Sequence, residues 1–354
     1  MTKLLKEYAL LLSIITLIII TLFEHTLAGS VGGNLIGLSI IFAVIMYASM
    51  SVAHHAEVLA EKFGEPYGTI ILTISAVIVE ITIIAIMMTQ SHNPNLARDT
   101  IYSAVILDIN GLLGMAAIVG GIKYGEQAYN IDSTNSYLAM IIVAIGISMI
   151  TPEFIAKEHL HNYMIFLVVV FILLYVVFSR VQLKRHRYFF EYKNEKEVKQ
   201  PHTENINGIC HAIALAILII LIGLLSEVLS EFMNNTLETF NLPLALGAVA
   251  VAVISASPEL ITAVRAALDN RMQTVVNIAF GASLSTVLLT IPSIIIVMDI
   301  ISKNINLSLT PLQSTMLGIT FFASIISFND GETNMLEGFI HVVIFIVFCY
   351  LLFI

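Results

Sequence analysis

The sequence has few charged residues, two cysteines and no tryptophan. Only 12% of its 354 residues are charged, while 58% are hydrophobic, a balance that excludes an ordinary soluble globular domain. Cys210 and Cys349 lie far apart in apolar segments, which argues against a disulfide or a cysteine metal site. The chain also lacks HExxH and GxSxG motifs, which argues against an intramembrane metalloprotease or a serine hydrolase. We therefore expect a protein that is not an enzyme.

Long apolar runs fill most of the chain. Each is about 20 residues or longer, enough to cross a bilayer as a helix. We therefore predict an all-α polytopic membrane protein with eleven transmembrane helices. The first run lacks a signal-peptide cleavage pattern, so we expect it to be retained. The predicted spans are residues 8–27, 34–62, 66–90, 100–122, 136–155, 160–180, 207–233, 242–267, 272–298, 311–328 and 333–353.

Lysine and arginine are unevenly distributed among the connecting segments. With the N-terminus in the cytoplasm, all but three of the sixteen basic residues fall on the cytoplasmic side, the exceptions being Arg98, Lys157 and Lys303. The positive-inside rule therefore predicts a multi-pass protein of the inner (plasma) membrane with a cytoplasmic N-terminus and an external C-terminus. Membrane lipid is the expected surrounding, no nucleic-acid partner is expected, and a homo-oligomer is compatible with the sequence.

A long polar segment, Ser179–Asn205, joins the sixth and seventh predicted spans. It leaves five spans on each side after an extra first helix. Because each half has an odd number of spans, the halves face opposite ways, as in an inverted repeat. We predict an N-terminal helix (1–33), a first five-helix repeat (34–180), a cytoplasmic linker (181–206) and a second five-helix repeat (207–354).

A short pattern recurs in the second span of each half. GTIILTISAVIVEI occupies residues 68–81 and GAVAVAVISASPEL occupies residues 247–260, each with glutamate at its thirteenth position. These residues, Glu80 and Glu259, lie deep in their spans, where a carboxylate costs roughly 2.5–3.5 kcal/mol on insertion scales and needs a partner, a cavity or a proton. We predict that both bind the transported cation and carry protons. The alternative is a protonated glutamate that hydrogen-bonds a neighbouring helix.

The second pattern contains a proline inside a predicted span. Pro258 has no N–H, so the carbonyl of Ile254 loses its helical donor. Ser255 lies one turn before Glu259 on the same face of the helix, and Ser257 adds a second hydroxyl in the same stretch. Hard cations such as Ca²⁺ prefer several oxygen ligands, so we predict that these oxygens belong to the metal site. The alternative is a plain packing kink.

Three further residues extend the predicted metal site. Thr73 lies seven residues before Glu80 and shares its helix face. Asp108 lies in the fourth predicted span and Ser283 in the ninth, which are corresponding elements of the two halves. For the serine, close helix packing is the alternative interpretation.

Two glutamates near span ends extend the predicted proton pathway. Glu57 lies near the end of the second span and Glu231 near the end of the seventh. We predict that they pass protons or ions to the glutamates at the membrane centre. Glu227 is an alternative to Glu231, and simple exposure to water is the alternative role for all three.

Three segments resemble the calcium/cation exchanger superfamily, and within it the bacterial Cha-type branch of the cation/proton exchangers. They are GEPYGTIILTISAVIVEI, SPELITAVRAALDNRMQTVVNIAFGAS and DGETNMLEGFIHVVIF. The resemblance implies that the glutamate of each repeat, here Glu80 and Glu259, binds the cation and carries protons. It also implies an acid at Glu57 and favours Glu231 in the second half.

The chain departs from the wider proton-coupled family at one feature of each repeat. That family has a Gly-Asn pair before the glutamate, where this chain has Ala76-Val77 and Ser255-Ala256. An amide oxygen is therefore missing from both halves, which leaves open whether the site prefers calcium over sodium or potassium. We predict a proton-coupled antiporter that exports Ca²⁺, as substrate and not as cofactor, in exchange for H⁺. The alternatives are a Na⁺ or K⁺/H⁺ antiporter on the same scaffold and a cation channel.

Overall fold

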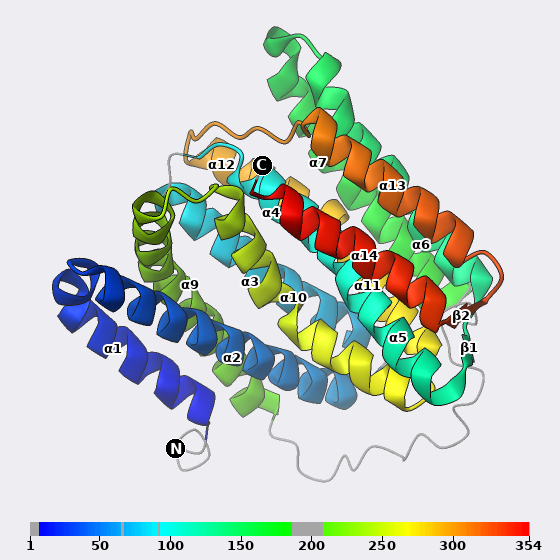
Figure 1. The fold of residues 1–354 in the computed structure, drawn as a ribbon, viewed down its shortest axis with the longest axis horizontal. Helices are drawn as coiled ribbons and strands as arrows, with labels where there is room; N and C mark the ends of the chain where they lie inside the picture. Colours follow the sequence, from blue (N-terminus) through cyan, green and yellow to red (C-terminus); the bar gives the residue numbers. More distant parts are fainter. Residues whose placement is uncertain (1–6, 65–66, 91–92, 186–207, 354) are drawn as a thin grey trace. The chain divides into compact units, whose positions relative to one another are not determined.

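The computed structural model describes residues 7–64, 67–90, 93–185 and 208–353. These residues form helices and one small two-stranded sheet (Figure 1). The predicted linker, residues 181–206, lies mostly outside the described residues. The all-α architecture predicted from the apolar runs is confirmed.

Eight helical stretches of the described chain are long and apolar enough to cross a membrane. They are α2 (Val31–Phe63), α3 (Tyr67–Gln90), α4 with α5 (Leu96–Ile106, Leu113–Tyr124), α6 (Ile131–Ile145) continued to Phe154, α7 (Lys157–Arg180) continued to Leu183, α9 (Gly208–Thr239), α10 (Ala245–Leu268), and α11 with α12 (Met272–Ser285, Ile291–Ile300). Three shorter apolar helices follow the remaining runs, namely α1 (Tyr8–Ala28), α13 (Pro311–Ser327) and α14 (Met335–Leu351). The number of helices that cross the bilayer stays a prediction.

The chain forms two compact units, and each takes helices from both halves of the sequence. The first contains α1, α2, α3, α9 and α10 up to Pro258, and the second contains the remaining helices together with α10 from Glu259 onward. This spatial division differs in kind from the predicted division into repeats, because it joins the early spans of both halves in one unit. One of its boundaries falls at the proline inside α10.

The first unit is built around an antiparallel pair of long helices, α2 and α9. Near the start of α2, the Asn34 amide donates to the Phe232 carbonyl at 3.1 Å and to the Thr236 hydroxyl at 2.6 Å, near the end of α9. Near the end of α2, Nδ1 of His55 lies 2.9 Å from Nδ1 of His211, at the start of α9. These contacts at opposite ends require that the two helices run in opposite directions.

The second unit packs α14 closely against α5 (Figure 1). A Cβ atom at Gly338 would lie 2.7 Å from the Gly114 carbonyl oxygen, and one at Gly114 would lie 3.0 Å from the Gly338 carbonyl oxygen. Real Cβ atoms essentially never come as close to backbone as 2.7 Å, so Gly338 requires glycine, and a side chain at Gly114 would be tightly crowded. The small residues let the two backbones meet, as is common where helices associate in membranes.

A short sheet joins two loops of the second unit. Strand β1 (Glu126–Ala128) pairs antiparallel with β2 (Glu332–Asn334), with Gln127 opposite Thr333. The Gln127 amide also donates to the Ala267 carbonyl at 3.0 Å, where α10 ends. Burial and the nearby Asp330 carboxylate raise the pKa of Tyr129, so its hydroxyl keeps the proton that it donates to the Glu332 carbonyl at 3.2 Å. Three loops therefore meet at this end.

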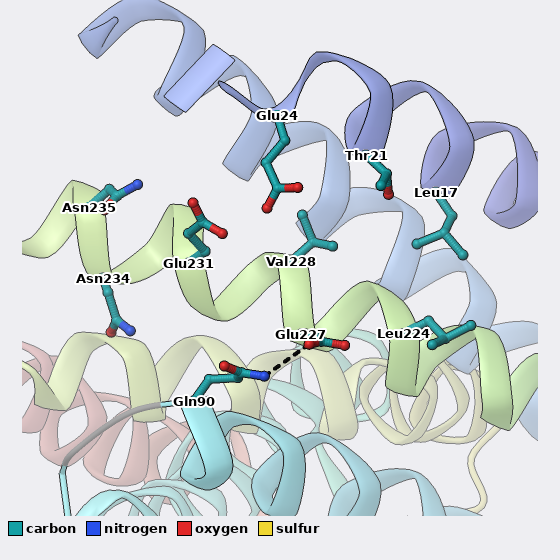
Figure 2. Close-up of a pocket in the computed structure, with 10 residues that line it drawn as sticks. All are labelled: Leu17, Thr21, Glu24, Gln90, Leu224, Glu227, Val228, Glu231, Asn234 and Asn235. Carbon is teal, nitrogen blue, oxygen red and sulfur yellow. Dashed lines mark hydrogen bonds between the residues drawn. The ribbon is translucent and has the colours of Figure 1, made fainter. Parts of the chain in front are cut away.

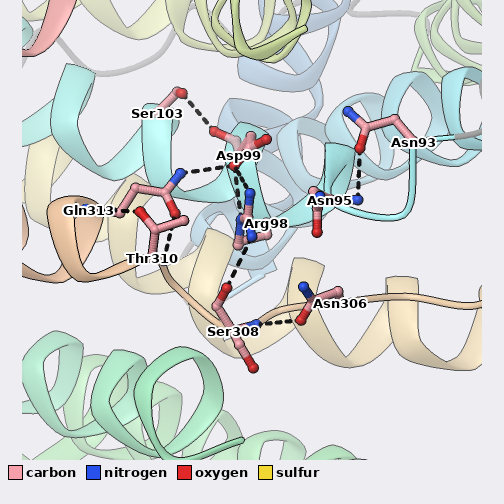
Figure 3. Close-up of polar contacts among 9 residues, drawn as sticks. All are labelled: Asn93, Asn95, Arg98, Asp99, Ser103, Asn306, Ser308, Thr310 and Gln313. Atoms are coloured by element: carbon pink, nitrogen blue, oxygen red, sulfur yellow. Dashed lines mark hydrogen bonds and ion pairs between the residues drawn. The ribbon is translucent and has the colours of Figure 1, made fainter. Parts of the chain in front are cut away.

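A different set of loops meets around Arg98 (Figure 3). The Arg98 guanidinium lies 2.8 Å from the Asp99 carboxylate and donates to the Ser308 carbonyl at 3.1 Å. The amide of Gln313 also donates to Asp99, at 2.8 Å, and forms a capping box with Thr310 at the start of α13. These loops are the ones that the charge distribution places outside, whereas those joined by β1 and β2 are the ones it places in the cytoplasm.

Two pairs of α-helices are joined end to end by π-helical turns. Residues Leu107–Leu112 separate α4 from α5, and Thr286–Thr290 separate α11 from α12. Both complete stretches have 29 residues, and α3 and α10 both have 24. Corresponding helices of the two halves thus agree in length. A π-helical turn widens the helix locally and occurs often at functional sites.

Candidate functional site

The structure brings together two of the predicted ligands in the second unit, Asp108 and Ser283. Asp108 lies in the first π-helical turn with 3% of its surface exposed, and Ser283 lies in α11 with none exposed. The Ser283 hydroxyl donates to a carboxylate oxygen of Asp108 at 3.1 Å. The pair therefore offers carboxylate and hydroxyl oxygen atoms inside an apolar helical layer, the donor chemistry that hard cations prefer.

Asn110, in the same π-helical turn, connects this pair to two other helices. Its amide nitrogen donates to the Thr320 hydroxyl of α13 at 2.9 Å. Its amide oxygen lies 2.9 Å from Nδ1 of His341 in α14. Sequence reasoning missed Thr320 and His341 as neighbours of this turn. The available signal was a single histidine inside an otherwise apolar run.

The proline of α10 has the local effect that the sequence predicts, and the chain partly compensates for it. The Ile254 carbonyl, which loses its N–H donor to Pro258, accepts a hydrogen bond from the Ser257 hydroxyl at 2.8 Å. The Ser255 hydroxyl donates to the Ala252 carbonyl at 3.1 Å. Each of these oxygens keeps a lone pair. The expected oxygen-rich stretch is present, but the Ile254 carbonyl already has a donor.

The two repeat glutamates differ in exposure. Glu80 is buried in α3 with 4% of its surface exposed, and Thr73 on the same helix is half-buried. Glu259 is half-buried in α10. The predicted metal ligands fall into both units, the first containing Thr73, Glu80, Ile254, Ser255 and Ser257 and the second containing Asp108, Glu259 and Ser283.

Within the described part of the chain, no group of three or more histidine, cysteine, aspartate or glutamate side chains is placed to hold a metal ion. The contact between Asp108 and Ser283 instead joins a single carboxylate to a hydroxyl group. Whether each residue binds the cation stays a prediction.

A polar pocket of about 600 Å³ opens in the first unit (Figure 2). Both Glu227 and Glu231 of α9 line it, together with Glu24 of α1. The amide of Gln90, the last residue of α3, donates to Glu227 at 3.0 Å. The structure thus places Glu231 and its alternative, Glu227, at the same pocket.

Glu57 lies at the opposite end of the first unit from this pocket. It is exposed on α2, two residues after His55, which contacts the start of α9. The pocket lies instead along the later part of α9. The predicted entrance carboxylates thus occupy two different ends of the same helical unit.

The family of the chain is decided by its match to a family model over residues 33–184 and 211–354, that of the sodium/calcium exchanger protein family. The chain belongs to this family. The resemblance to the cation exchangers is thereby confirmed over most of the sequence.

The chain is similar to bacterial antiporters. It is 30% identical to the sodium-potassium/proton antiporter ChaA of Escherichia coli, covering 96% of this chain and 94% of that protein. It is 27% identical to the Ca²⁺/H⁺ antiporter ChaA of Bacillus subtilis, covering 64% and 66%. The crystal structure of the selenium-substituted Ca²⁺/H⁺ antiporter YfkE has the same fold, with a TM-score of 0.77, 19% identity and coverage of 98% and 99%.

Proposed function

We propose that this exchanger is a proton-coupled cation antiporter that exports Ca²⁺ in exchange for H⁺. The observation that carries the proposal is a buried carboxylate in each unit. Glu80 lies deep in α3, and Asp108 accepts a hydrogen bond from Ser283 in a π-helical turn. Buried acids in apolar helices usually mark ion pathways or proton relays. The similarity to antiporters that move calcium, sodium or potassium against protons supports the same reaction here.

The exchange follows from competition for the same oxygen atoms. A carboxylate in an apolar environment is stable when it holds a proton or lies beside a cation, and costly when it is charged and alone. We propose that Glu80 and Glu259 each have two low-energy states, protonated or ionised beside a cation. A site that is charged and empty disfavours the change of access from one side of the membrane to the other. An inward proton gradient therefore drives the cation outward.

The internal repeat supplies the alternating access that exchange requires. The long helices α2 and α9 run antiparallel, and the next two spans agree in length between the halves. These features support two inverted repeats with the binding site near the membrane centre, the architecture of many secondary transporters. We place the N-terminus in the cytoplasm and the C-terminus outside.

The two entrances of the first unit fit this orientation. Glu57 lies at the end assigned to the cytoplasm, and the pocket with Glu231 lies at the end assigned to the outside. We propose that these carboxylates pass protons or cations between water and the central glutamates. Their exposure lets them exchange ions rapidly with the solvent.

A Na⁺ or K⁺/H⁺ antiporter is the second candidate function. It is favoured by one sequence feature, the absence of an asparagine amide before Glu80 and Glu259. Fewer oxygen ligands discriminate less strongly in favour of a divalent cation. The similarity to a sodium-potassium/proton antiporter points the same way.

Proton flux in liposomes containing the purified protein tests these functions. Ca²⁺, Na⁺ and K⁺ are added separately outside acid-loaded vesicles, and a pH-sensitive dye reports the proton movement. We expect the largest flux with Ca²⁺. Proton flux with Na⁺ or K⁺ but not Ca²⁺ would establish the second function, and cation uptake without any proton movement would establish a channel.

A further inference from the structure

A buried polar network in the second unit connects the π-helical turn of Asp108 to α13 and α14. Asn110 donates to Thr320 at 2.9 Å, and His341 lies 2.9 Å from the Asn110 amide oxygen. All three side chains have no exposed surface. Nothing in the exchange chemistry described above uses His341 or Thr320.

The direction of the hydrogen bonds follows from the amide. Because the Asn110 nitrogen donates to Thr320, its oxygen accepts, and Nδ1 of His341 is the donor. Nε2 of this histidine has no hydrogen-bond partner among the described residues. The imidazole ring lies against Phe328, with centroids 5.2 Å apart. His341 therefore contributes one directed N–H from an otherwise apolar environment.

Close packing of α14 against α5 determines where this donor lies. Its Gly338 packs backbone to backbone against Gly114, one turn from the histidine. A Cβ atom at Gly114 would also lie 3.0 Å from Cβ of His341. The histidine thus approaches the helix that continues directly from the π-helical turn.

A π-helical turn is rare and occurs mostly as a single turn inside an α-helix, often at a functional site. Asn110 lies in the middle of the turn Leu107–Leu112, two residues after Asp108. Its bonds to α13 and α14 hold one side of the turn. The bond between Ser283 and Asp108 is formed from α11.

We propose that His341 is a positioning residue of the exchange site, which acts through Asn110 to fix the π-helical turn with its Asp108 carboxylate at Ser283. This inference rests on the proposed function. His341 touches the asparagine and not the aspartate, so it orients a ligand and does not itself bind the cation. Its nitrogen is also a poorer match than oxygen for a hard cation.

Two pairs of variants test the proposal. His341→Asn retains an N–H close to the position of Nδ1, whereas His341→Leu removes it at similar volume. Thr320→Ser keeps the hydroxyl, whereas Thr320→Val removes it at similar shape. We expect His341→Leu and Thr320→Val to raise the apparent KM for the cation about five- to thirty-fold, the effect of one unmade buried hydrogen bond. The conservative variants should stay within about two-fold.

The measurement is cation-driven proton flux per folded protein, with the folded amount set by size-exclusion chromatography. A further test combines His341→Leu with Asp108→Asn. If the histidine acts through the aspartate, His341→Leu adds little to the effect of Asp108→Asn, because coupled residues are not additive.

Unchanged KM in both His341→Leu and Thr320→Val, with only the folded yield reduced, would overturn the positioning role and leave the proposed function intact. Fully additive effects with Asp108→Asn would overturn it as well. Absence of cation-driven proton flux from the unchanged protein would overturn the proposed function and this inference together.

Discussion

At the residue scale, the arrangement depends on how each polar side chain inside an apolar helix is satisfied. Asp108 accepts a hydrogen bond from Ser283, and Asn110 is hydrogen-bonded to Thr320 and His341. Ser257 supplies the donor that Pro258 cannot. Unsatisfied polar groups are costly in a membrane, so each of these contacts lowers the cost of a polar side chain inside an apolar helix.

Pro258→Ala tests the role of the proline at this scale. The alanine supplies an N–H to the Ile254 carbonyl and removes an interior proline, which costs about 3 kcal/mol in a helix. We expect a higher melting temperature. Because Ser257 already compensates in part, the gain in the free energy of unfolding should be smaller than about 3 kcal/mol. Cation affinity should fall roughly five- to a hundred-fold, as an oxygen ligand returns to the helix.

Ser257→Ala provides the matched control. It should destabilise the parent protein by about 1–3 kcal/mol, the cost of an unsatisfied buried carbonyl, and have little effect when combined with Pro258→Ala. Thermal unfolding in detergent measures both. Unchanged cation affinity in Pro258→Ala would mean that the proline is only a packing kink.

At the element scale, helix ends and turns decide which acids belong to the site. Glu337 illustrates an acid outside it, because its carboxylate accepts from the Asn334 N–H at 3.4 Å while the Asn334 side chain accepts from the Glu337 N–H at 3.2 Å. This capping box starts α14. The presence of an acid in the first turn of this apolar helix is therefore explained by local structure.

Glu337→Gln should leave cation affinity within a few-fold of the parent, since glutamine also completes a capping box. Asn334→Ala should reduce stability by about 1 kcal/mol. Asp108→Asn, in contrast, should weaken cation binding more than either, because it removes a charged ligand. Affinity measured from cation-driven proton flux would contradict this ranking if Glu337→Gln lost more than Asp108→Asn.

Elements that depend on hydropathy could be predicted from the sequence, and those that depend on local geometry could not. The apolar runs gave helix positions to within a few residues, for example 66–90 for α3 and 311–328 for α13. The β1–β2 pair and the π-helical turns have no such signal, because strands of three residues are too short to show a pattern and a π-helical turn leaves the mean hydropathy of its helix unchanged.

The candidate site was predictable to the same extent. Asp108 and Ser283 could be placed on corresponding spans, and the structure joins them by a hydrogen bond. The contacts of Asn110 with Thr320 and His341 could not be predicted, since they join segments more than two hundred residues apart and depend on helix packing. The assignment of any of these residues to cation binding stays a prediction.

At the scale of the whole molecule, the loops of the second unit form two separate sets of contacts, one at each end of its helices. One end joins β1, β2 and the end of α10, while the other joins Arg98 to Ser308 and Met149 to Leu309. The same division follows from counting alternate crossings of the membrane from a cytoplasmic N-terminus. Loop contacts and charge distribution therefore support one topology.

Reporter fusions test this topology. A reporter fused after Lys193 should lie in the cytoplasm and one fused after Ile354 should lie outside, because five spans separate them. A fusion after Lys123 serves as a cytoplasmic control from the first half. If the reporters at Lys193 and Ile354 lie on the same side, the inverted repeat is disproved.

The central claim, exchange of a cation against protons at Glu80 and Glu259, is tested most directly by Ca²⁺-driven proton flux in liposomes containing Glu80→Gln or Glu259→Gln. Glutamine keeps the size and the hydrogen bonding of the side chain but cannot carry the charge or the exchanged proton. We expect both variants to insert normally and to lose exchange, while Glu158→Gln, at a carboxylate side chain that is 79% exposed, retains it. Substantial exchange by either glutamine variant would contradict the claim.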